Sequence, residues 1–233
     1  CIRDRVYDSR KITKDCLFVC IEGANFDGHQ AAAEAAEKKA AAIIVSQEVE
    51  LPKQSETTLI RVEDTRYALA FVSAAWFDHP AKKLTTIGIT GTKGKTTTTY
   101  LVKSILENAG RKVGLVGTIE IIIGDTHIHA VNTTPESYLL QEYFAKMVES
   151  GCDTVVMEVS SQALMLHRTQ GFVFDFGIFT NLEPDHIGPN EHGSFEEYAH
   201  CKSLLFQQCR VGIANCDDVH WPVSYTHLTL PTI

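Results

Sequence analysis

Residues 84–100 read Leu-Thr-Thr-Ile-Gly-Ile-Thr-Gly-Thr-Lys-Gly-Lys-Thr-Thr-Thr-Thr-Tyr. The first seven alternate apolar and small residues as a buried strand does, the next five are rich in glycine and lysine, and a helix can begin at Thr96. A strand, a glycine loop and a helix start form a phosphate cradle, because backbone N–H groups and the helix N-terminus face the anion. Lys95 is placed to reach the terminal phosphates, and the Thr96 hydroxyl to bind magnesium. The stretch predicts a nucleoside triphosphate site.

The loop departs from the strict Walker spacing, which needs a glycine at the position of Ile89. The alternative is an ordinary turn between strand and helix that carries a surface lysine. The order of strand, loop and helix favours the phosphate site over that turn. The loop by itself does not say which P-loop enzyme this is.

Composition limits the class of protein. A chain of 233 residues with 44% hydrophobic content can bury one large or two modest globular cores. A net charge of -8 without a basic cluster argues against a nucleic-acid partner and favours small-molecule substrates. Seven cysteines without CxxC spacing indicate reduced thiols in a cytoplasmic protein rather than disulfides or zinc. No run of residues is long and apolar enough to span a membrane, so we expect no membrane partner. We also expect a monomer. The chain begins with Cys1 rather than methionine, which suggests a fragment.

Alternating strand and helix patterns predict an α/β chain with a mostly parallel sheet flanked by helices. We expect a small amino-terminal α/β domain at residues 1–80 and an incomplete P-loop domain at residues 84–220, joined by a linker at 80–83. Strands are expected at 17–21, 41–46, 58–62, 84–90, 113–117, 153–157, 174–179 and 211–215. Helices are expected at 30–40, from Asp64 to 76, from 96, from 135 to about 150, and at 195–208. Residues 119–128 predict a hairpin that turns at 124–125.

Polar residues follow three of these strands, at 91–96, 158–161 and 180–186. The carboxyl ends of parallel strands share one edge of a sheet, so the three segments should face one crevice. Thr96 and Glu158 would each supply an oxygen ligand to magnesium there. His186, in the third segment, could be a further ligand. The alternative for Glu158 is a solvated carboxylate at a strand end, and the alternative for His186 is a capping or surface role.

Five motifs occur together in order: Gly-Thr-Lys-Gly-Lys-Thr-Thr at 91–97, Asn-Thr-Thr-Pro at 132–135, Glu-Val-Ser-Ser-Gln-Ala at 158–163, Thr-Asn-Leu-Glu-Pro-Asp-His-Ile at 180–187 and Tyr-Ala-His-Cys-Lys-Ser-Leu-Leu-Phe at 198–206. Together they resemble the Mur ligase family, and within it the UDP-N-acetylmuramoyl-tripeptide synthetases of the MurE type. Residues 8–10 and 23–29 are similar to the uridine-binding amino-terminal domain of that type. The resemblance covers about residues 6–218, and residues 221–233 look like a tail foreign to the family.

The resemblance implies an ATP-dependent amide ligase of peptidoglycan synthesis that uses ATP and Mg²⁺. In such enzymes ATP phosphorylates the free carboxylate of UDP-N-acetylmuramoyl-L-alanyl-D-glutamate, and the amine of a third amino acid attacks the acyl phosphate. The family's lysine at position 202 is carbamylated, whereas the sequence alone would make Lys202 a surface lysine. The implied ATP-binding residues are Gly91, Thr92, Lys93, Gly94, Lys95, Thr96 and Thr97, and the catalytic residues are Lys95, His186 and Lys202. The implied metal ligands are Thr96, Glu158, His186 and carbamylated Lys202. The implied substrate contacts are Ser9, Ala24, Asn25 and Phe26 for the uridine nucleotide, and Thr133, Thr134, Ser160 and Arg168 for the muramoyl dipeptide.

Two features depart from the family pattern. Leu166 replaces a polar residue found in some relatives, and residues 185–192 differ from the Asp-His-Leu-Asp form of diaminopimelate-adding enzymes, which hints at another third amino acid. The family's amino-acid-binding domain is absent, so we expect this chain alone to bind substrates without completing ligation. Two other readings stay open: another ligase of the superfamily, such as a folylpolyglutamate synthetase or a neighbouring muramoyl ligase, and a non-catalytic nucleotide-binding module. Residues 8–10 and 23–29 favour a UDP-sugar binder over a folate enzyme.

Overall fold

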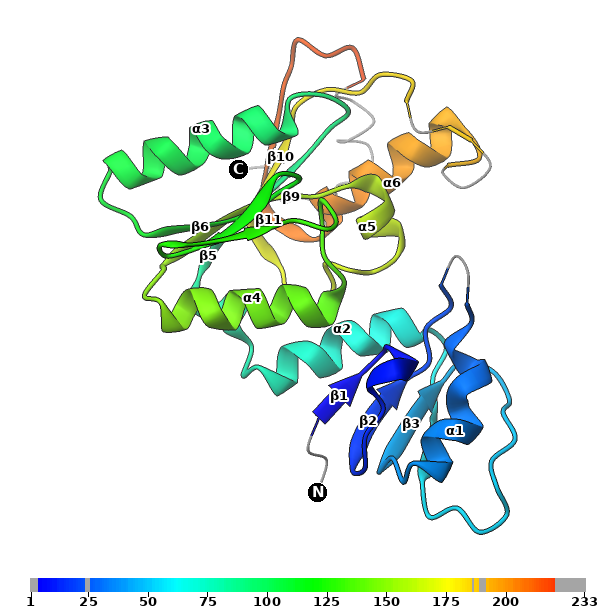
Figure 1. The fold of residues 1–233 in the computed structure, drawn as a ribbon. Helices are drawn as coiled ribbons and strands as arrows, with labels where there is room; N and C mark the ends of the chain where they lie inside the picture. The colour runs from blue at the N-terminus through cyan, green and yellow to red at the C-terminus, as the bar shows by residue number, and fades with distance from the viewer. Residues whose placement is uncertain (1–3, 24–25, 186, 189–191, 221–233) are drawn as a thin grey trace. The chain divides into compact units, whose positions relative to one another are not determined.

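The computed structural model of this chain describes residues 4–23, 26–185, 187–188 and 192–220. The chain divides into two compact units, Cys1–Ser73 and Ala74–Ile233. Both are built from strands and helices in alternation, as Figure 1 shows. The predicted α/β class is therefore confirmed.

The first unit contains a four-stranded parallel sheet in the order β1-β2-β3-β4. Its strands are β1 (Asp4–Val6), β2 (Cys16–Val19), β3 (Ala42–Val45) and β4 (Thr58–Arg61). Residues of β2 and β3 are all buried, as expected for central strands of a parallel sheet. The short helix α1 (Ala32–Glu37) packs its alanines on this sheet, following the 3-10 turn η2 (Gly28–Ala31). A second 3-10 turn, η1 (Ser9–Lys11), follows β1.

Helix α2 (Thr65–Trp76) begins where the sequence predicts it. The Asp64 carboxylate accepts a hydrogen bond from the Tyr67 N–H at 2.8 Å, which satisfies one of the free N–H groups of the first turn. The 3-10 turn η3 (Pro80–Lys83) then occupies the segment expected to be a linker.

The second unit contains a seven-stranded sheet in the order β11-β10-β5-β9-β6-β7-β8. The five strands from β11 to β6 are parallel, and β7 and β8 form the predicted antiparallel hairpin around Gly124, whose φ is 56°. Their bounds are β5 (Thr85–Thr90), β6 (Val113–Val116), β7 (Glu120–Ile123), β8 (Thr126–His129), β9 (Thr154–Glu158), β10 (Phe174–Phe179) and β11 (Cys209–Ala214). Since β5 lies between β10 and β9, the segments that follow these three strands leave the sheet side by side.

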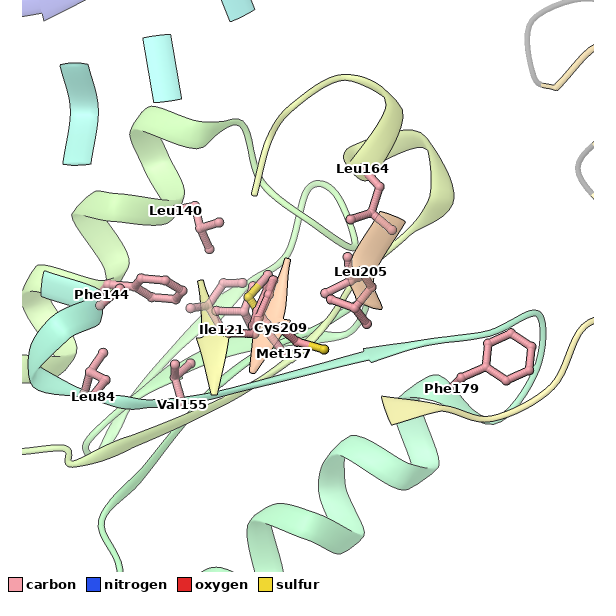
Figure 2. Packing of buried hydrophobic residues seen from close by; sticks show 14 of the residues in the cluster. Leu84, Ile121, Leu140, Phe144, Val155, Met157, Leu164, Phe179, Leu205 and Cys209 are labelled. Carbon is pink, nitrogen blue, oxygen red and sulfur yellow. The ribbon is translucent and has the colours of Figure 1, made fainter. Parts of the chain in front are cut away.

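Helices cover both faces of this sheet (Figure 1). Helix α3 (Lys95–Asn108) packs Val102 and Leu106 on one face, against β5, β6 and β9. Helices α4 (Ser137–Glu149), α5 (Ser161–Met165) and α6 (Phe195–Gln207) cover the other face. Figure 2 shows that larger core, in which Leu140 and Phe144 of α4 point toward the strands. Gly114 of β6 allows this approach, because a Cβ there would lie 2.5 Å from Met147 Sδ.

One helix differs in extent from the prediction, and two short elements were not predicted. The helix expected at 30–40 is shorter, because Lys39 adopts a left-handed conformation with φ of 60° and ends it. Strand β1 and helix α5 were not predicted; β1 has three residues and α5 has five, which is too short for a periodic pattern. Residues 221–233 lie outside the described part of the chain, so their expected foreign origin stays a prediction.

Five of the described cysteines are buried and free, and Cys216 is exposed and free. The expectation of burial is met by these five cysteines and not by Cys216. None of the helices among the described residues has the length and apolar character that crossing a membrane requires.

Candidate functional site

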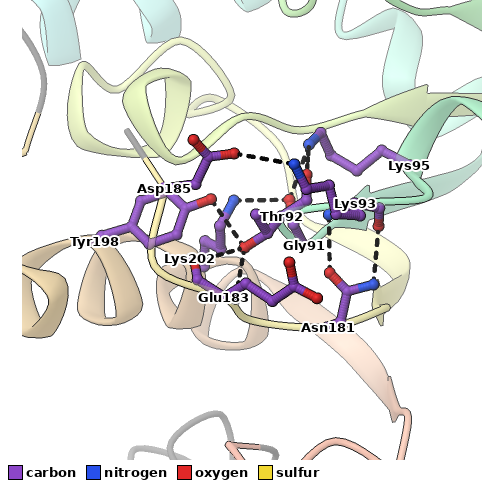
Figure 3. A network of polar contacts seen from close by, with 9 residues as sticks. All are labelled: Gly91, Thr92, Lys93, Lys95, Asn181, Glu183, Asp185, Tyr198 and Lys202. Atoms are coloured by element: carbon purple, nitrogen blue, oxygen red, sulfur yellow. Dashed lines mark hydrogen bonds and ion pairs between the residues drawn. The ribbon is translucent and has the colours of Figure 1, made fainter. Parts of the chain in front are cut away.

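The glycine loop predicted from the sequence follows β5 and is held against the end of β10. Gly91 has a φ of 145°, and a Cβ there would lie 2.0 Å from Thr180 Oγ1, so only glycine allows this approach. Asn181 binds the backbone of Lys93 through both atoms of its amide: its Oδ1 accepts from the Lys93 N–H at 2.8 Å, and its Nδ2 donates to the Lys93 carbonyl at 3.1 Å (Figure 3). Gly94, with a φ of 80°, caps the start of α3. The loop therefore has a fixed shape at the carboxyl edge of the sheet.

Two lysine ammonium groups converge on one carbonyl of this loop. Lys95 Nζ donates to the Gly91 carbonyl at 2.8 Å and to the Thr92 carbonyl at 3.1 Å, and Lys202 Nζ donates to the same Gly91 carbonyl at 2.8 Å (Figure 3). Burial lowers the pKa of Lys95, against the opposing effect of the Glu158 and Asp185 carboxylates. Burial and the neighbouring Lys95 charge lower the pKa of Lys202 to about 7. Lys202 is 2% exposed, so it is not the surface lysine that the sequence alone would suggest.

Glu158 ends β9 and is 1% exposed, which excludes the solvated carboxylate considered above. Its Oε2 accepts from Thr96 Oγ1 at 3.0 Å and from Thr118 Oγ1 at 3.1 Å, and its Oε1 accepts from the Thr118 N–H at 2.9 Å. Thr118 was not predicted as part of the site. The carboxylate and the Thr96 hydroxyl are oxygen donors of the kind that Mg²⁺ prefers, and they already touch.

Among the described residues, Thr96 and Glu158 are the predicted magnesium ligands that the structure brings together. In the described residues the structure contains no group of three or more histidine, cysteine and acidic side chains that could hold a metal ion. Mg²⁺ in phosphate-transfer sites is commonly held by one or two protein ligands together with phosphate oxygens, so two oxygen donors suit it. His186, the expected further ligand, lies outside the described residues.

Helix α6 is joined to the glycine loop by a buried hydroxyl network that the sequence did not reveal. Tyr198 is fully buried, and its hydroxyl lies 3.1 Å from Thr92 Oγ1, which also accepts from the Glu183 N–H at 3.0 Å. The Tyr198 ring lies 4.4 Å from Lys202 Nζ, within the range of a cation–π contact. Figure 3 shows these side chains packed around the loop, so Lys202 is positioned by the loop and by its own helix.

A pocket of about 300 Å³ opens beside Lys95 in the second unit. It is lined by all four residues expected on the muramoyl dipeptide side, Thr133, Thr134, Ser160 and Arg168. The residues of the lining that were not assigned a role are Asn132, Ser161, Gln162, Met165 and His192.

Hydrogen bonds give this pocket a fixed wall. Thr134 Oγ1 donates to the Glu158 carbonyl at 3.0 Å and accepts from the Ser160 N–H at 3.1 Å. Arg168 donates to the Thr134 carbonyl at 3.2 Å and pairs with Glu136 at 2.9 Å, which fixes its planar guanidinium. The pocket wall and the end of β9 are therefore one bonded assembly.

His192 is a lining residue for which the sequence gave no signal. Its Nε2 lies 2.8 Å from Ser161 Oγ, and the residue is 2% exposed. The partner sits 31 positions earlier in the chain, so only the folded structure brings the two together.

The remaining predicted contacts lie elsewhere or on the surface. Ser9 and Phe26 line a separate pocket of about 430 Å³ in the first unit, together with Asp8 and Arg10. Phe26 is 50% exposed, so half of this large apolar side chain is open to solvent or to a ligand. Thr97 is exposed on the first turn of α3. Ala24 and Asn25 lie outside the described residues.

Comparison with known proteins gives two family matches. The model described as "Mur ligase middle domain" matches residues 89–229, and the model described as "Mur ligase family, catalytic domain" matches residues 6–77.

Curated relatives agree with these matches. The UDP-N-acetylmuramoyl-L-alanyl-D-glutamate--2,6-diaminopimelate ligase of Clostridium perfringens is 48% identical over 212 residues, which is 91% of this chain and 43% of that protein. The enzyme of the same name from Geobacillus thermodenitrificans is 42% identical over 237 residues, which is 97% of this chain and 47% of that protein. The chain thus spans less than half the length of these relatives.

Solved structures show the same fold. A UDP-N-acetylmuramoyl-L-alanyl-D-glutamate--2,6-diaminopimelate ligase superposes with a TM-score of 0.80 at 24% identity, over 96% of this chain and 45% of the other. MurF from Acinetobacter baumannii gives 0.61 at 20% identity, over 97% and 47%. Folylpolyglutamate synthase from Mycobacterium tuberculosis gives 0.53 at 14% identity, over 70% and 43%. At these identities the similarity concerns the fold alone.

Proposed function

Since the chain belongs to the Mur ligase family, whose members are ATP-dependent amide ligases, we propose that it binds ATP and UDP-N-acetylmuramoyl-L-alanyl-D-glutamate for the addition of a third amino acid in peptidoglycan synthesis. One observation carries this proposal: Lys95 belongs both to the glycine loop and to the lining of the 300 Å³ pocket. A phosphate held by the loop would therefore lie beside whatever occupies the pocket. That is the arrangement that phosphoryl transfer to a bound carboxylate requires.

The chemistry assigned to the residues follows from their positions. A carboxylate becomes an electrophile when phosphorylation turns one of its oxygens into a leaving group, and the transfer depends on alignment and on charge neutralisation. In this proposal the backbone at 91–97 binds the phosphates, Lys95 neutralises the transferred group, and Arg168 binds an acidic group of the dipeptide. Thr133, Thr134 and Ser160 provide hydroxyl contacts, and the attacking amine comes from the third amino acid.

Magnesium would be held by Thr96 and Glu158, with His186 as a further ligand, and would neutralise phosphate charge when bound. The neutral amine of Lys202 is proposed to attack carbon dioxide: an N–C bond forms as one C=O π bond opens, and the nitrogen releases a proton to solvent to leave a carbamate anion. The low pKa of Lys202 supplies the neutral amine that this reaction needs at neutral pH. Carbon-13 NMR with labelled bicarbonate tests this proposal: a carbamate resonance that is absent from Lys202→Met supports it, and a resonance equal in both proteins refutes it.

The pocket of the first unit suits the uridine nucleotide. Ser9 and Phe26 face it, and Arg10, which pairs with Asp8 at 2.8 Å, adds a cation for the diphosphate. We assign residues 1–80 to the UDP-sugar domain and residues 84–220 to the ATP-binding domain. The monomeric state and the cytoplasmic location stay predictions.

The names of the relatives favour 2,6-diaminopimelate as the added amino acid, over the different amino acid hinted at by residues 185–192. A folylpolyglutamate-type ligase is the first alternative; it has no need of the first-unit pocket. A non-catalytic nucleotide-binding module is the second, and it predicts nucleotide binding without muramoyl dipeptide binding.

Isothermal titration of this chain with the UDP-muramoyl dipeptide tests the proposal, with UDP-glucose as the control ligand. Arg168→Gln should weaken dipeptide binding by about tenfold or more, because a charge-assisted hydrogen bond contributes about 1.5–3 kcal/mol. Lys146→Gln is the matched control, since Lys146 is a half-exposed cation on α4 paired with Glu142 at 2.6 Å, outside the pocket. Equal binding of UDP-glucose and of the dipeptide by folded protein would contradict the assigned substrate.

A further inference from the structure

A second cavity of about 310 Å³ lies at the opposite edge of the large sheet, within the second unit. Leu84, just before β5, and Asp175, in the first half of β10, belong to its lining, whereas the glycine loop follows the other end of β5. A six-residue strand spans about 20 Å, so the two sites are well separated. The polar and aromatic residues of the lining are His79, Lys82, Gln141, Phe172, Asp175 and Arg210.

Gln141 is the unusual member of this lining. It is fully buried on α4, and neither its Nε2 nor its Oε1 has a hydrogen-bond partner anywhere in the described chain. A buried polar atom without a partner lowers the stability of the folded protein by about 1–3 kcal/mol, so a carboxamide with both atoms unpaired is strongly destabilising. Buried polar groups without a hydrogen-bond partner are rare in native proteins. A bound molecule that supplies the missing partners would explain why a glutamine is buried at this position.

The rim of the cavity carries more positive than negative charge. Lys82 and Arg210 are cations. Asp175 is the acidic member, and its Oδ2 is already engaged by the Thr86 N–H at 2.9 Å, while its Oδ1 lies 3.6 Å from Arg210. An anionic group at the rim would therefore meet a net attraction.

We propose that this cavity is a second small-molecule site, for a carboxylate that carries an amide, such as an N-acylated amino acid or a short peptide. The amide of the ligand would pair with Gln141, whose carboxamide offers one donor side and one acceptor side, and the carboxylate would lie between Lys82 and Arg210. Phe172 and the apolar Leu84 and Ala81 would contact the carbon atoms between these two groups.

Gln141 must turn toward the cavity to make this pair, because its amide atoms are covered in the structure. The rotation between staggered side-chain conformations breaks no hydrogen bond, since the amide has none in the described chain. The ligand therefore gains both bonds without displacing an existing partner.

The test is a titration of the isotope-labelled chain with N-acetylglycine, followed by NMR. We expect saturable shifts at the Gln141 side-chain amide and at the Gly171 backbone amide, which also lines the cavity. Gln141→Leu should fold, because an apolar side chain of similar size replaces an unpaired polar one, and should weaken binding by about tenfold. The double variant Lys82→Gln/Arg210→Gln changes rim side chains and should weaken binding by a similar factor. Lys146→Gln, on the same unit, should bind as the parent chain does.

Two results would overturn the proposal. One is an absence of saturable shifts at the Gln141 side-chain amide and the Gly171 backbone amide. The other is binding that Gln141→Leu leaves unchanged. The readout residues lie at the far edge of the sheet from Lys95, and neither ATP nor the muramoyl dipeptide is present, so the result does not depend on the ligase proposal. Acetate and acetamide, each tested alone, show whether both halves of the ligand are needed.

Discussion

Replacing Thr134 by valine keeps the shape of the side chain and removes one hydroxyl from the wall of the 300 Å³ pocket. Thr134 is 1% exposed. Its Oγ1 donates a hydrogen bond to the Glu158 carbonyl at 3.0 Å and accepts one from the Ser160 N–H at 3.1 Å. Valine leaves the buried Glu158 carbonyl and the part-buried Ser160 N–H without these bonds, at about 1–3 kcal/mol each. The expected loss of unfolding free energy is about 2–6 kcal/mol.

Thr134→Ser is the matched control. It keeps the hydroxyl and removes one methyl group, so the expected loss is about 1 kcal/mol. Urea unfolding followed by circular dichroism gives the two free energies, and amide exchange at Ser160 shows whether the change is local to the end of β9. The reasoning is refuted if valine costs no more than serine, or if the Ser160 amide exchanges equally slowly in both variants.

Three further outcomes follow from the structure. Gly91→Ala should abolish nucleotide binding, because its Cβ would lie 2.0 Å from Thr180 Oγ1 and the loop must move; unchanged ATP affinity in a calorimetric titration would contradict this. In buffer free of carbon dioxide, the free energy of unfolding should rise between pH 7 and about pH 10. The reason is that Lys202, with a pKa of about 7 in the folded chain, binds fewer protons in this range than it does in the unfolded chain. Lys202→Met should flatten this rise, and parallel curves for the two proteins would refute the assignment. Iodoacetamide at pH 8 should label exposed Cys216 in the native protein and spare Cys20, whose pKa burial raises to about 12; equal labelling of the two peptides by mass spectrometry would contradict the packing.

Local signals explain what the sequence predicted well. The glycine loop and the strands around it are encoded by neighbouring residues: glycines for unusual backbone angles, then hydroxyls and a lysine at a helix start. The parallel sheet followed from the alternation of apolar strands with helices, and it placed the ends of β5, β9 and β10 together. Residue types and topology were therefore enough to identify Lys95, Thr96 and Glu158 as neighbours.

The parts that were missed depend on partners distant in sequence. Thr118 is 40 residues from Glu158, and Tyr198 is 106 residues from Thr92, so no local pattern marks either pair. Burial decided two alternatives that the sequence left open: Glu158 and Lys202 could each be read as surface residues, and packing of the strand and of α6 buries both. Short elements such as β1 and α5 are fixed by their surroundings rather than by their own periodicity.

The Gly91 carbonyl, as a common acceptor for Lys95 and Lys202, makes the two lysines one thermodynamic unit. Each ammonium group raises the cost of charging its neighbour, so their free energies are not additive. In a double-mutant cycle, Lys95→Met should raise the pKa of Lys202. The double variant should lose more unfolding free energy than the sum of the single losses, because each single replacement also relieves the repulsion, which the double variant relieves only once. Replacing either lysine therefore reports on both residues, and the coupling energy between Lys95 and Lys202 is the quantity that describes the site.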